Sequence, residues 1–155
     1  MNRTINIIKD VNLIEKELNE TPSGVLAFYS EEEKVIQEAT NFLYKDKNIF
    51  IFFAENDELF EKIRLNTFVS FTILRNTKKE KSKKPQNNIE SYLISVTING
   101  IIKLVDDKKL INSLQTQYTV KYHPGSKQEK IDFVPIERIL LIDSEEIQAF
   151  EEIGN

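Results

Sequence analysis

The most regular hydrophobic pattern in the chain lies between residues 39 and 75, where strand-like segments surround one short amphipathic segment. Phe42 and Tyr44 mark the first strand-like segment, and apolar residues fill 49–53 in the second. A polar tetrapeptide at 45–48 separates the two segments, so the pattern predicts a hairpin. Because apolar side chains occupy both faces of the second strand, we expect both of its faces to be covered.

The residues after this hairpin predict a short helix and a further strand. Asn56 can cap a helix whose first turn is acidic, and Leu59, Phe60 and Ile63 form its apolar face. Residues 67–74 are β-branched and aromatic, which favours a strand.

The remaining pattern predicts two more helices and several strands. Ile7, Val11, Ile14 and Leu18 have helical spacing, whereas 144–153 fits neither class clearly and has only a weak helical pattern. We expect a helix at about 4–19 within an N-terminal segment 1–22, and a second helix at 106–118 that Asp106 caps. The expected strands are 24–29, 35–44, 91–105 and 131–143. Pro135 suggests an edge or a bulge in the last strand.

A basic run with almost no apolar residues follows the strand at 67–74. Such a run can bind an anionic partner or form a solvated loop, and charge runs are usually solvated. We expect a flexible basic hairpin loop at 76–90, because the segments on both sides are strands that need a common sheet. The chain is therefore expected to form a single domain over residues 1–155.

Composition narrows the class of protein. The chain has 155 residues, 40% of them hydrophobic and 30% charged, with a net charge of −4. This charge disfavours general binding to nucleic acid or to an anionic membrane. No apolar run approaches the roughly 20 residues that a membrane-spanning helix needs, and the N-terminal residues lack a signal-peptide pattern. We therefore expect a cytoplasmic protein.

The usual catalytic motifs are missing from the sequence. The chain has no cysteine and one histidine, His123, beside a Pro-Gly turn. A zinc site with imidazole or thiolate ligands needs more, so we expect no metal site. No nucleophile elbow, phosphate-binding loop or dinucleotide-binding glycine pattern is present. Catalytic residues stay unidentified.

The segment KIRLNTFVSF at 62–71, which follows IFIFF at 49–53 and a short helix, resembles the pyridoxamine 5'-phosphate oxidase-like, FMN-binding split barrels. The resemblance covers roughly residues 24–143 and implies a mainly β (α+β) fold, a six-stranded antiparallel split β-barrel with flanking helices. Asn99-Gly100 is by its chemistry a hairpin signal. The resemblance instead implies one long strand, which we expect to bend at Gly100.

The same resemblance implies a homodimer that holds a small-molecule ligand, FMN, at its subunit interface. The flavin ring would lie against Glu38, Ala39, Thr40 and Asn41, and its phosphate near the start of the short helix. FMN-binding split barrels commonly place Ser and Lys there, and this chain has Asp57 and Leu59 at the matching positions. The basic residues that could hold the phosphate instead are Lys62, Arg64 and Arg75.

These residues support two functions of different classes. The first is a flavoprotein acting as a small oxidoreductase or flavin reductase, in which the cofactor performs the electron transfer and the protein orients it. The second is a split barrel that has lost its flavin and serves as a binding or regulatory module, because acids surround the helix start. Haem degradation is a third option, for which His123 is the single obvious axial ligand.

Overall fold

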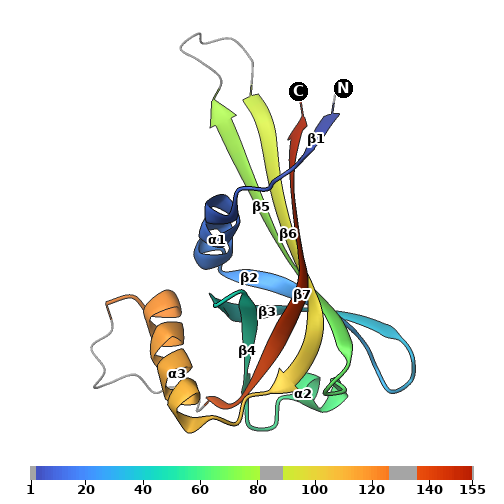
Figure 1. The fold of residues 1–155 in the computed structure, drawn as a ribbon, viewed down its shortest axis with the longest axis vertical. Coiled ribbons are helices and arrows are strands. Elements are labelled where there is room, and N and C mark those ends of the chain that lie inside the picture. Colours follow the sequence, from blue (N-terminus) through green and yellow to red (C-terminus); the bar gives the residue numbers. More distant parts are fainter. Residues whose placement is uncertain (1–2, 81–88, 126–135, 155) are drawn as a thin grey trace.

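The computed structural model describes residues 3–80, 89–125 and 136–154, and an antiparallel sheet that closes on itself dominates it (Figure 1). Six strands pair around a ring and a seventh lies outside it, so the predicted six-stranded split barrel is confirmed. In ring order the strands are β7 (Ile136–Gly154), β4 (Asn48–Ala54), β3 (Val35–Lys45), β2 (Ser23–Tyr29), β5 (Phe68–Glu80) and β6 (Ile89–Leu104), which returns to β7.

The barrel interior holds the apolar side chains that the alternation predicts. Phe42 of β3 and Phe71 of β5 are fully buried, and their rings meet edge to face with centroids 4.9 Å apart. Ile49, Ile51 and Phe53 of β4 point into the same core. A buried aromatic of this size contributes roughly 3–5 kcal/mol relative to alanine, so this hairpin is a main source of barrel stability.

Helices cover the outside of the barrel. α1 (Val11–Glu20) places Leu18 in the main core, whereas α3 (Lys108–Tyr122) packs Leu114 against a second cluster that contains Phe50 and Ile139. Phe50 and Phe52 are thus covered from outside by α3, which confirms that both faces of β4 are covered. The third helix, α2 (Glu58–Lys62), follows β4. Among the described residues, no helix is both long and apolar enough to cross a bilayer.

The helix predicted at about residues 4–19 is wrong in its first residues. Residues predicted to begin a helix at about Thr4 form instead strand β1 (Arg3–Ile7), which pairs with the C-terminal end of β7. The helix begins only at Val11 because the Asp10 carboxylate accepts from the backbone N–H groups of Asn12 and Leu13, at 3.0 and 3.4 Å. The segment 1–22 is therefore a strand followed by a helix.

The C-terminal segment 144–153 is a strand, and not the helix that its weak spacing suggested. β7 runs without interruption to Gly154, with β6 along one side and β1 on the other side of its last residues. Hydrogen bonds to two neighbouring strands outweigh a weak local helical pattern. The described part of the predicted strand 131–143 begins at Ile136, and Pro135 lies outside the described residues.

Several other boundaries differ from their predictions. Asp57 caps α2, and Asn56 before it has a positive φ of 63°. α3 is capped by Asp107, one residue after Asp106, and continues to Tyr122 instead of ending at 118. Of the predicted flexible loop 76–90, residues 76–80 and 89–90 lie in β5 and β6, where Glu80 pairs with Ile89, and residues 81–88 lie outside the described residues.

The long strand β6 bends at Gly100, as predicted. The register of β6 against β7 shifts between Asn99 and Gly100, which is the signature of a β-bulge. A Cβ atom at Gly100 would collide with the backbone carbonyl of Asp143. A backbone carbonyl in a paired strand cannot move aside as a flexible side chain can, so this position needs glycine.

We expect Gly100→Ala to destabilise the protein by roughly 1–3 kcal/mol, because β6 and β7 must separate locally to admit the methyl group. Denaturant unfolding measures the change. Ser95→Ala, on the half-buried outer face of the same strand, is the control and should stay within about 0.5 kcal/mol of the wild type. Equal stability of the Gly100→Ala protein and the control would contradict the close approach.

Candidate functional site

The first half of β3 has an open edge. Residues 35–41 pair with β2 on one side, whereas β4 joins β3 on the other side only at Phe42. Among the described strands, none lies against that free side of residues 35–41. In an antiparallel strand the N–H and C=O groups of alternate residues face the same edge. Backbone donors and acceptors in this part of β3 therefore face outward from the ladder.

The four predicted ring-binding residues, Glu38 to Asn41, lie on this open segment of β3. Glu38 and Ala39 are exposed. Asn41 is also exposed and donates from Nδ2 to the Tyr118 hydroxyl at 3.2 Å. Thr40 is half-buried, and its Oγ1 is a fully buried oxygen without a hydrogen-bond partner. Buried hydroxyls normally find partners, so the Thr40 oxygen is an exception on this segment of β3.

Two residues at the end of α3, Lys121 and Tyr122, complete this end of the site. The Tyr122 hydroxyl accepts from the Phe42 backbone N–H at 2.9 Å and lies 2.8 Å from the Phe42 carbonyl and 2.7 Å from that of Pro22. Sequence reasoning missed both residues because the predicted helix ended at 118. The i, i+4 series Leu114, Tyr118, Tyr122 could have extended it.

The Lys121 ammonium group is unusual in its surroundings. It donates to the Phe42 carbonyl at 3.0 Å and lies 3.8 Å from the centroid of the Phe42 ring. No carboxylate of the described residues pairs with it. Burial lowers the pKa of Lys121 to about 8. Burial also raises the pKa of Tyr122 to about 12, so at neutral pH the phenol is neutral and Lys121 remains mostly charged.

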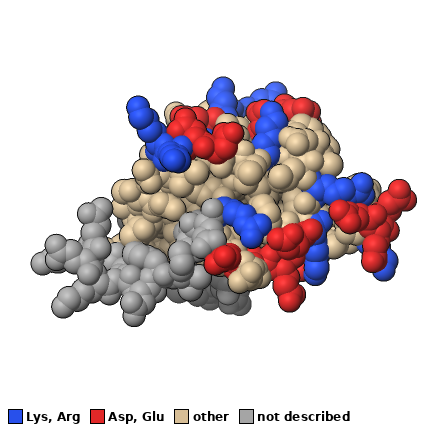
Figure 2. All heavy atoms as spheres, turned by 90° about the horizontal axis from the view of Figure 1, so that it is seen from below, with Lys and Arg blue, Asp and Glu red and all other residues tan. Residues whose placement is uncertain are grey.

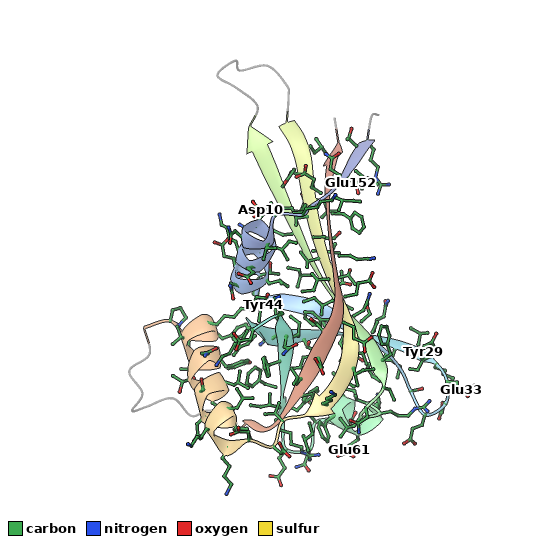
Figure 3. The ribbon with its side chains drawn as sticks, viewed as in Figure 1. Asp10, Tyr29, Glu33, Tyr44, Glu61 and Glu152 are labelled. Atoms are coloured by element: carbon green, nitrogen blue, oxygen red, sulfur yellow. The ribbon has the colours of Figure 1, made fainter. Side chains whose placement is uncertain are left out.

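The other end of the site is a cavity of about 380 Å³ between the β2–β3 hairpin and α2. Figure 3 shows Glu33 at the tip of this hairpin and Glu61 on α2. Acids outnumber bases in the wall, and Figure 2 shows basic and acidic side chains mixed on the lower face of the molecule. The charged lining residues are Glu31, Glu32, Glu61, Lys34 and Lys62.

Lys62 and Arg64 both lie at this end of the site. Lys62 lines the cavity and is exposed, and no described residue forms an ion pair with it. Arg64 donates from Nη2 to the carbonyl of Ser30 at 2.7 Å, which ties the segment after α2 to the hairpin. Both cations therefore lie beside the hairpin that carries the open segment of β3.

Arg75 lies elsewhere and already has two partners. Its Nη1 is 3.0 Å from Glu17 and 2.8 Å from Glu20, both on α1. The Glu17 side chain is only 7% exposed. An unpaired carboxylate there would be costly, so Arg75 stabilises the contact between α1 and β5.

Three solved structures share the arrangement of strands and helices over almost the whole chain. A candidate 5-nitroimidazole antibiotic resistance protein from Bacteroides thetaiotaomicron has a TM-score of 0.76 and 11% identity, covering 100% of this chain and 93% of its own. An FAD binding protein from Mycobacterium smegmatis has a TM-score of 0.65 and 13% identity, covering 96% and 99%. A candidate pyridoxamine 5'-phosphate oxidase from Corynebacterium glutamicum has a TM-score of 0.61 and 18% identity, covering 97% and 95%.

The chain has the split-barrel fold of the pyridoxamine 5'-phosphate oxidase-like proteins. No protein-family model matches the sequence, and no curated protein does. The fold is thus established by structural similarity alone. At sequence identities of 11–18%, the side chains that line a binding site can differ between proteins that share a fold.

The split barrel of this chain suits the ring of a flavin better than its phosphate. The open β3 edge and the unpartnered Thr40 oxygen are polar groups that a planar heteroaromatic ring with N–H and C=O groups can satisfy. At α2, by contrast, the Asp57 carboxylate accepts from the Leu59 N–H at 3.0 Å. Glu58 follows in the first turn, so acids occupy the position where the resemblance implies a phosphate.

We expect Arg75→Gln to destabilise this split barrel by roughly 1–3 kcal/mol, because the buried Glu17 carboxylate loses its cation. The expected loss of stability is smaller than for a fully buried ion pair, because Arg75 is 37% exposed and solvent screens its charge. Thermal or urea unfolding measures it, with Lys103→Gln as the control, since Lys103 pairs with Asp143 on the open surface. An unchanged stability together with a loss of FMN affinity would instead support a phosphate contact for Arg75.

Proposed function

We propose that this chain is a flavin-binding split-barrel protein and a small oxidoreductase, with the flavin at the interface of a homodimer. The open edge of β3 beside Thr40 and Asn41 carries this proposal. A flavin binding protein among the structures with this fold supports it. The bound flavin would supply the electron transfer, and the chain would bind and orient it.

The ring would bind along residues Glu38 to Asn41. Backbone N–H and C=O groups on the open edge can hydrogen-bond the polar edge of the ring, and the Thr40 hydroxyl gains the partner it lacks. Asn41 is fixed in place by the Tyr118 hydroxyl, so its amide is oriented before the ligand arrives. Preorganised polar groups of this kind give a binding site its specificity.

Lys62 and Arg64 would meet the phosphate of FMN, with Asp57 opposing them. At an effective dielectric constant near 20, a phosphate dianion about 4 Å from a carboxylate is repelled by several kcal/mol. The acids of α2 therefore reduce the gain that the phosphate brings. The proposal is for a site that recognises the flavin mainly through its ring.

We expect the purified protein to bind riboflavin and FMN with affinities within about tenfold of each other, because Asp57 offsets the phosphate contacts. Asp57→Asn keeps a capping residue and removes the charge, so it should strengthen FMN binding about tenfold and leave riboflavin binding unchanged. Quenching of flavin fluorescence during titration measures both constants. Glu145→Gln, an exposed carboxylate on β7, is the control.

Absence of binding by either flavin, with no gain in thermal stability at high flavin concentration, would overturn the flavin proposal. A ligand at 100 times its Kd should add about 2.7 kcal/mol to the free energy of unfolding. That outcome would support the second function, a flavin-free binding module, which the acidic start of α2 favours.

The homodimer would form through the outer face of the sheet beside the open edge. Tyr29 of β2 and Val35 of β3 are register partners on this face, and they are 61% and 62% exposed. On β5, Phe68 and Leu74 are 54% and 61% exposed. Apolar side chains gathered on one sheet face are typical of surfaces that become buried between subunits.

We expect a dimer at micromolar concentration, and Phe68→Lys should shift it to monomer by raising the dissociation constant at least about tenfold. Light scattering coupled to gel filtration distinguishes the two masses. Val120→Lys is the matched control, because Val120 is 68% exposed on α3 and lies outside the proposed interface. A wild-type protein that is monomeric throughout, or a Phe68→Lys protein that stays dimeric, would contradict this interface.

A further inference from the structure

A second open strand edge lies on β7, away from the flavin segment. β4 pairs with β7 up to Ile142, and β1 joins the same side of β7 only from Phe150, which pairs with Ile7. Between these ladders, the described strands leave residues 143–149 of β7 with β6 on one side only. Single hydrogen bonds flank this gap, from the Ser144 N–H to Asn48 Oδ1 at 3.1 Å and from the Ile8 N–H to the Ala149 carbonyl at 2.9 Å. α1 lies across this gap, and the space between α1 and β7 is a cavity of about 530 Å³. This volume is typical of small-molecule sites.

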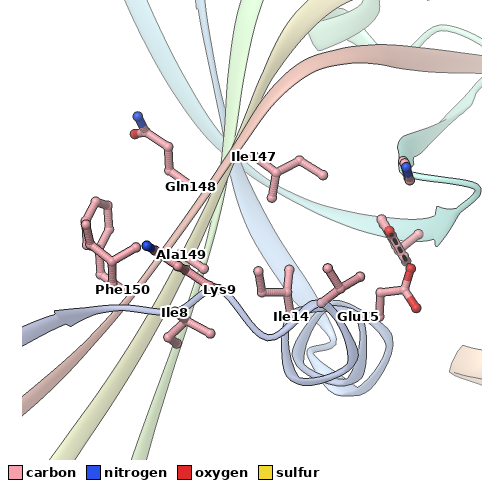
Figure 4. A pocket seen from close by; sticks show the side chains of 12 residues that line it. Ile8, Lys9, Ile14, Glu15, Ile147, Gln148, Ala149 and Phe150 are labelled. Atoms are coloured by element: carbon pink, nitrogen blue, oxygen red, sulfur yellow. Dashed lines mark hydrogen bonds between the residues drawn. The ribbon is translucent and has the colours of Figure 1, made fainter.

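The walls of this cavity are mostly aliphatic. Figure 4 shows Ile14 and Glu15 of α1 on one side and Ile147 to Phe150 of β7 on the other, with Ile8 between β1 and α1. Ile7 and Val11 also line it and remain 67% and 59% exposed. Such an apolar hollow, left open to water, gains stability when a hydrocarbon group fills it.

The charged groups of the cavity favour an anion. Lys9 and Lys47 both line it, and no described residue forms an ion pair with either. Its single carboxylate, Glu15, accepts a hydrogen bond from the Tyr44 hydroxyl at 3.2 Å. Burial and this hydrogen bond raise the pKa of Tyr44 to about 12, so the phenol stays neutral. The lining therefore has two unpaired cations and one carboxylate that already has a donor.

We propose that this cavity binds a small amphipathic carboxylate, of the kind of a medium-chain fatty acid. The hydrocarbon chain lies against Ile8, Ile14 and Ile147, and the carboxylate reaches the rim, where it pairs with Lys9 or Lys47. The uncharged polar groups are too few to favour a sugar or a peptide. The site is separate from the proposed flavin segment and goes beyond that function.

The experiment compares three probes with the same ten-carbon chain on the full-length protein: decanoate, decanol and decyltrimethylammonium. Isothermal titration calorimetry measures their binding. We expect saturable binding of decanoate, binding of decanol at least about tenfold weaker, and no binding of the cation.

The variant Lys9→Gln/Lys47→Gln should weaken decanoate at least about tenfold and leave decanol unchanged, because only the carboxylate uses the lysines. Lys16→Gln, a charge change on α1 outside the cavity lining, is the control and should behave as the wild type. Riboflavin binding should be the same in all three proteins. This last measurement separates a failure of this proposal from a failure of the flavin proposal.

Three results would overturn the proposal. The first is no saturable binding of decanoate. The second is equal affinity for decanoate and decanol, and the third is unchanged decanoate binding by the double lysine variant. A cavity covered by a second copy of the chain would give the first result, with a monomer–dimer equilibrium that shifts in the double variant.

Discussion

Pairing of β6 with β7 closes the barrel, and the unequal lengths of the strands in that closed ring determine which strand edges have no strand partner. β6 and β7 have 16 and 19 residues, whereas β2 and β4 have 7 each. The short strands cannot pair with the long ones over the full length of the long ones. The ring therefore leaves strand edges without a strand partner, at 35–41 of β3 and at 143–149 of β7.

Open edges have to be managed, because unpaired backbone groups are costly when buried and promote aggregation when exposed. In this chain, helices pack beside the strands at places where the strand pairing stops. Tyr122 of α3 bonds the backbone of Phe42 and the carbonyl of Pro22, just before β2 begins, and α1 covers the gap along β7. α1 does not fill its gap completely, since a cavity remains beside Ile147, and on β3 the Thr40 oxygen stays without a partner. The two proposed binding sites are these incompletely covered edges.

Features that depend on the chemistry of neighbouring residues could be predicted from the sequence. Alternation around Phe42 and Phe50 located the hairpin, because that pattern depends on residues that are adjacent in sequence. At Gly100 the local chemistry favoured a hairpin, and only the family resemblance predicted the long bent strand that the structure has. Features that depend on pairing between strands far apart in the sequence could not be predicted. Arg3 to Ile7 is a strand because β7 offers an edge, and 144–153 is a strand because β6 and β1 flank it. The position of Lys62 and Arg64 beside the β2–β3 hairpin and the partners of Arg75 on α1 follow only from the fold.

Amide hydrogen exchange followed by mass spectrometry tests most directly whether ligands bind at the open edges. With saturating riboflavin, we expect exchange to slow within residues 35–41 and to stay unchanged within 143–149, because only the first edge gains hydrogen-bond partners. With saturating decanoate, we expect the segments that line the second cavity, in β7 and α1, to be protected instead. Protection of the same segment by both ligands, or of neither edge by its own ligand, would contradict the account.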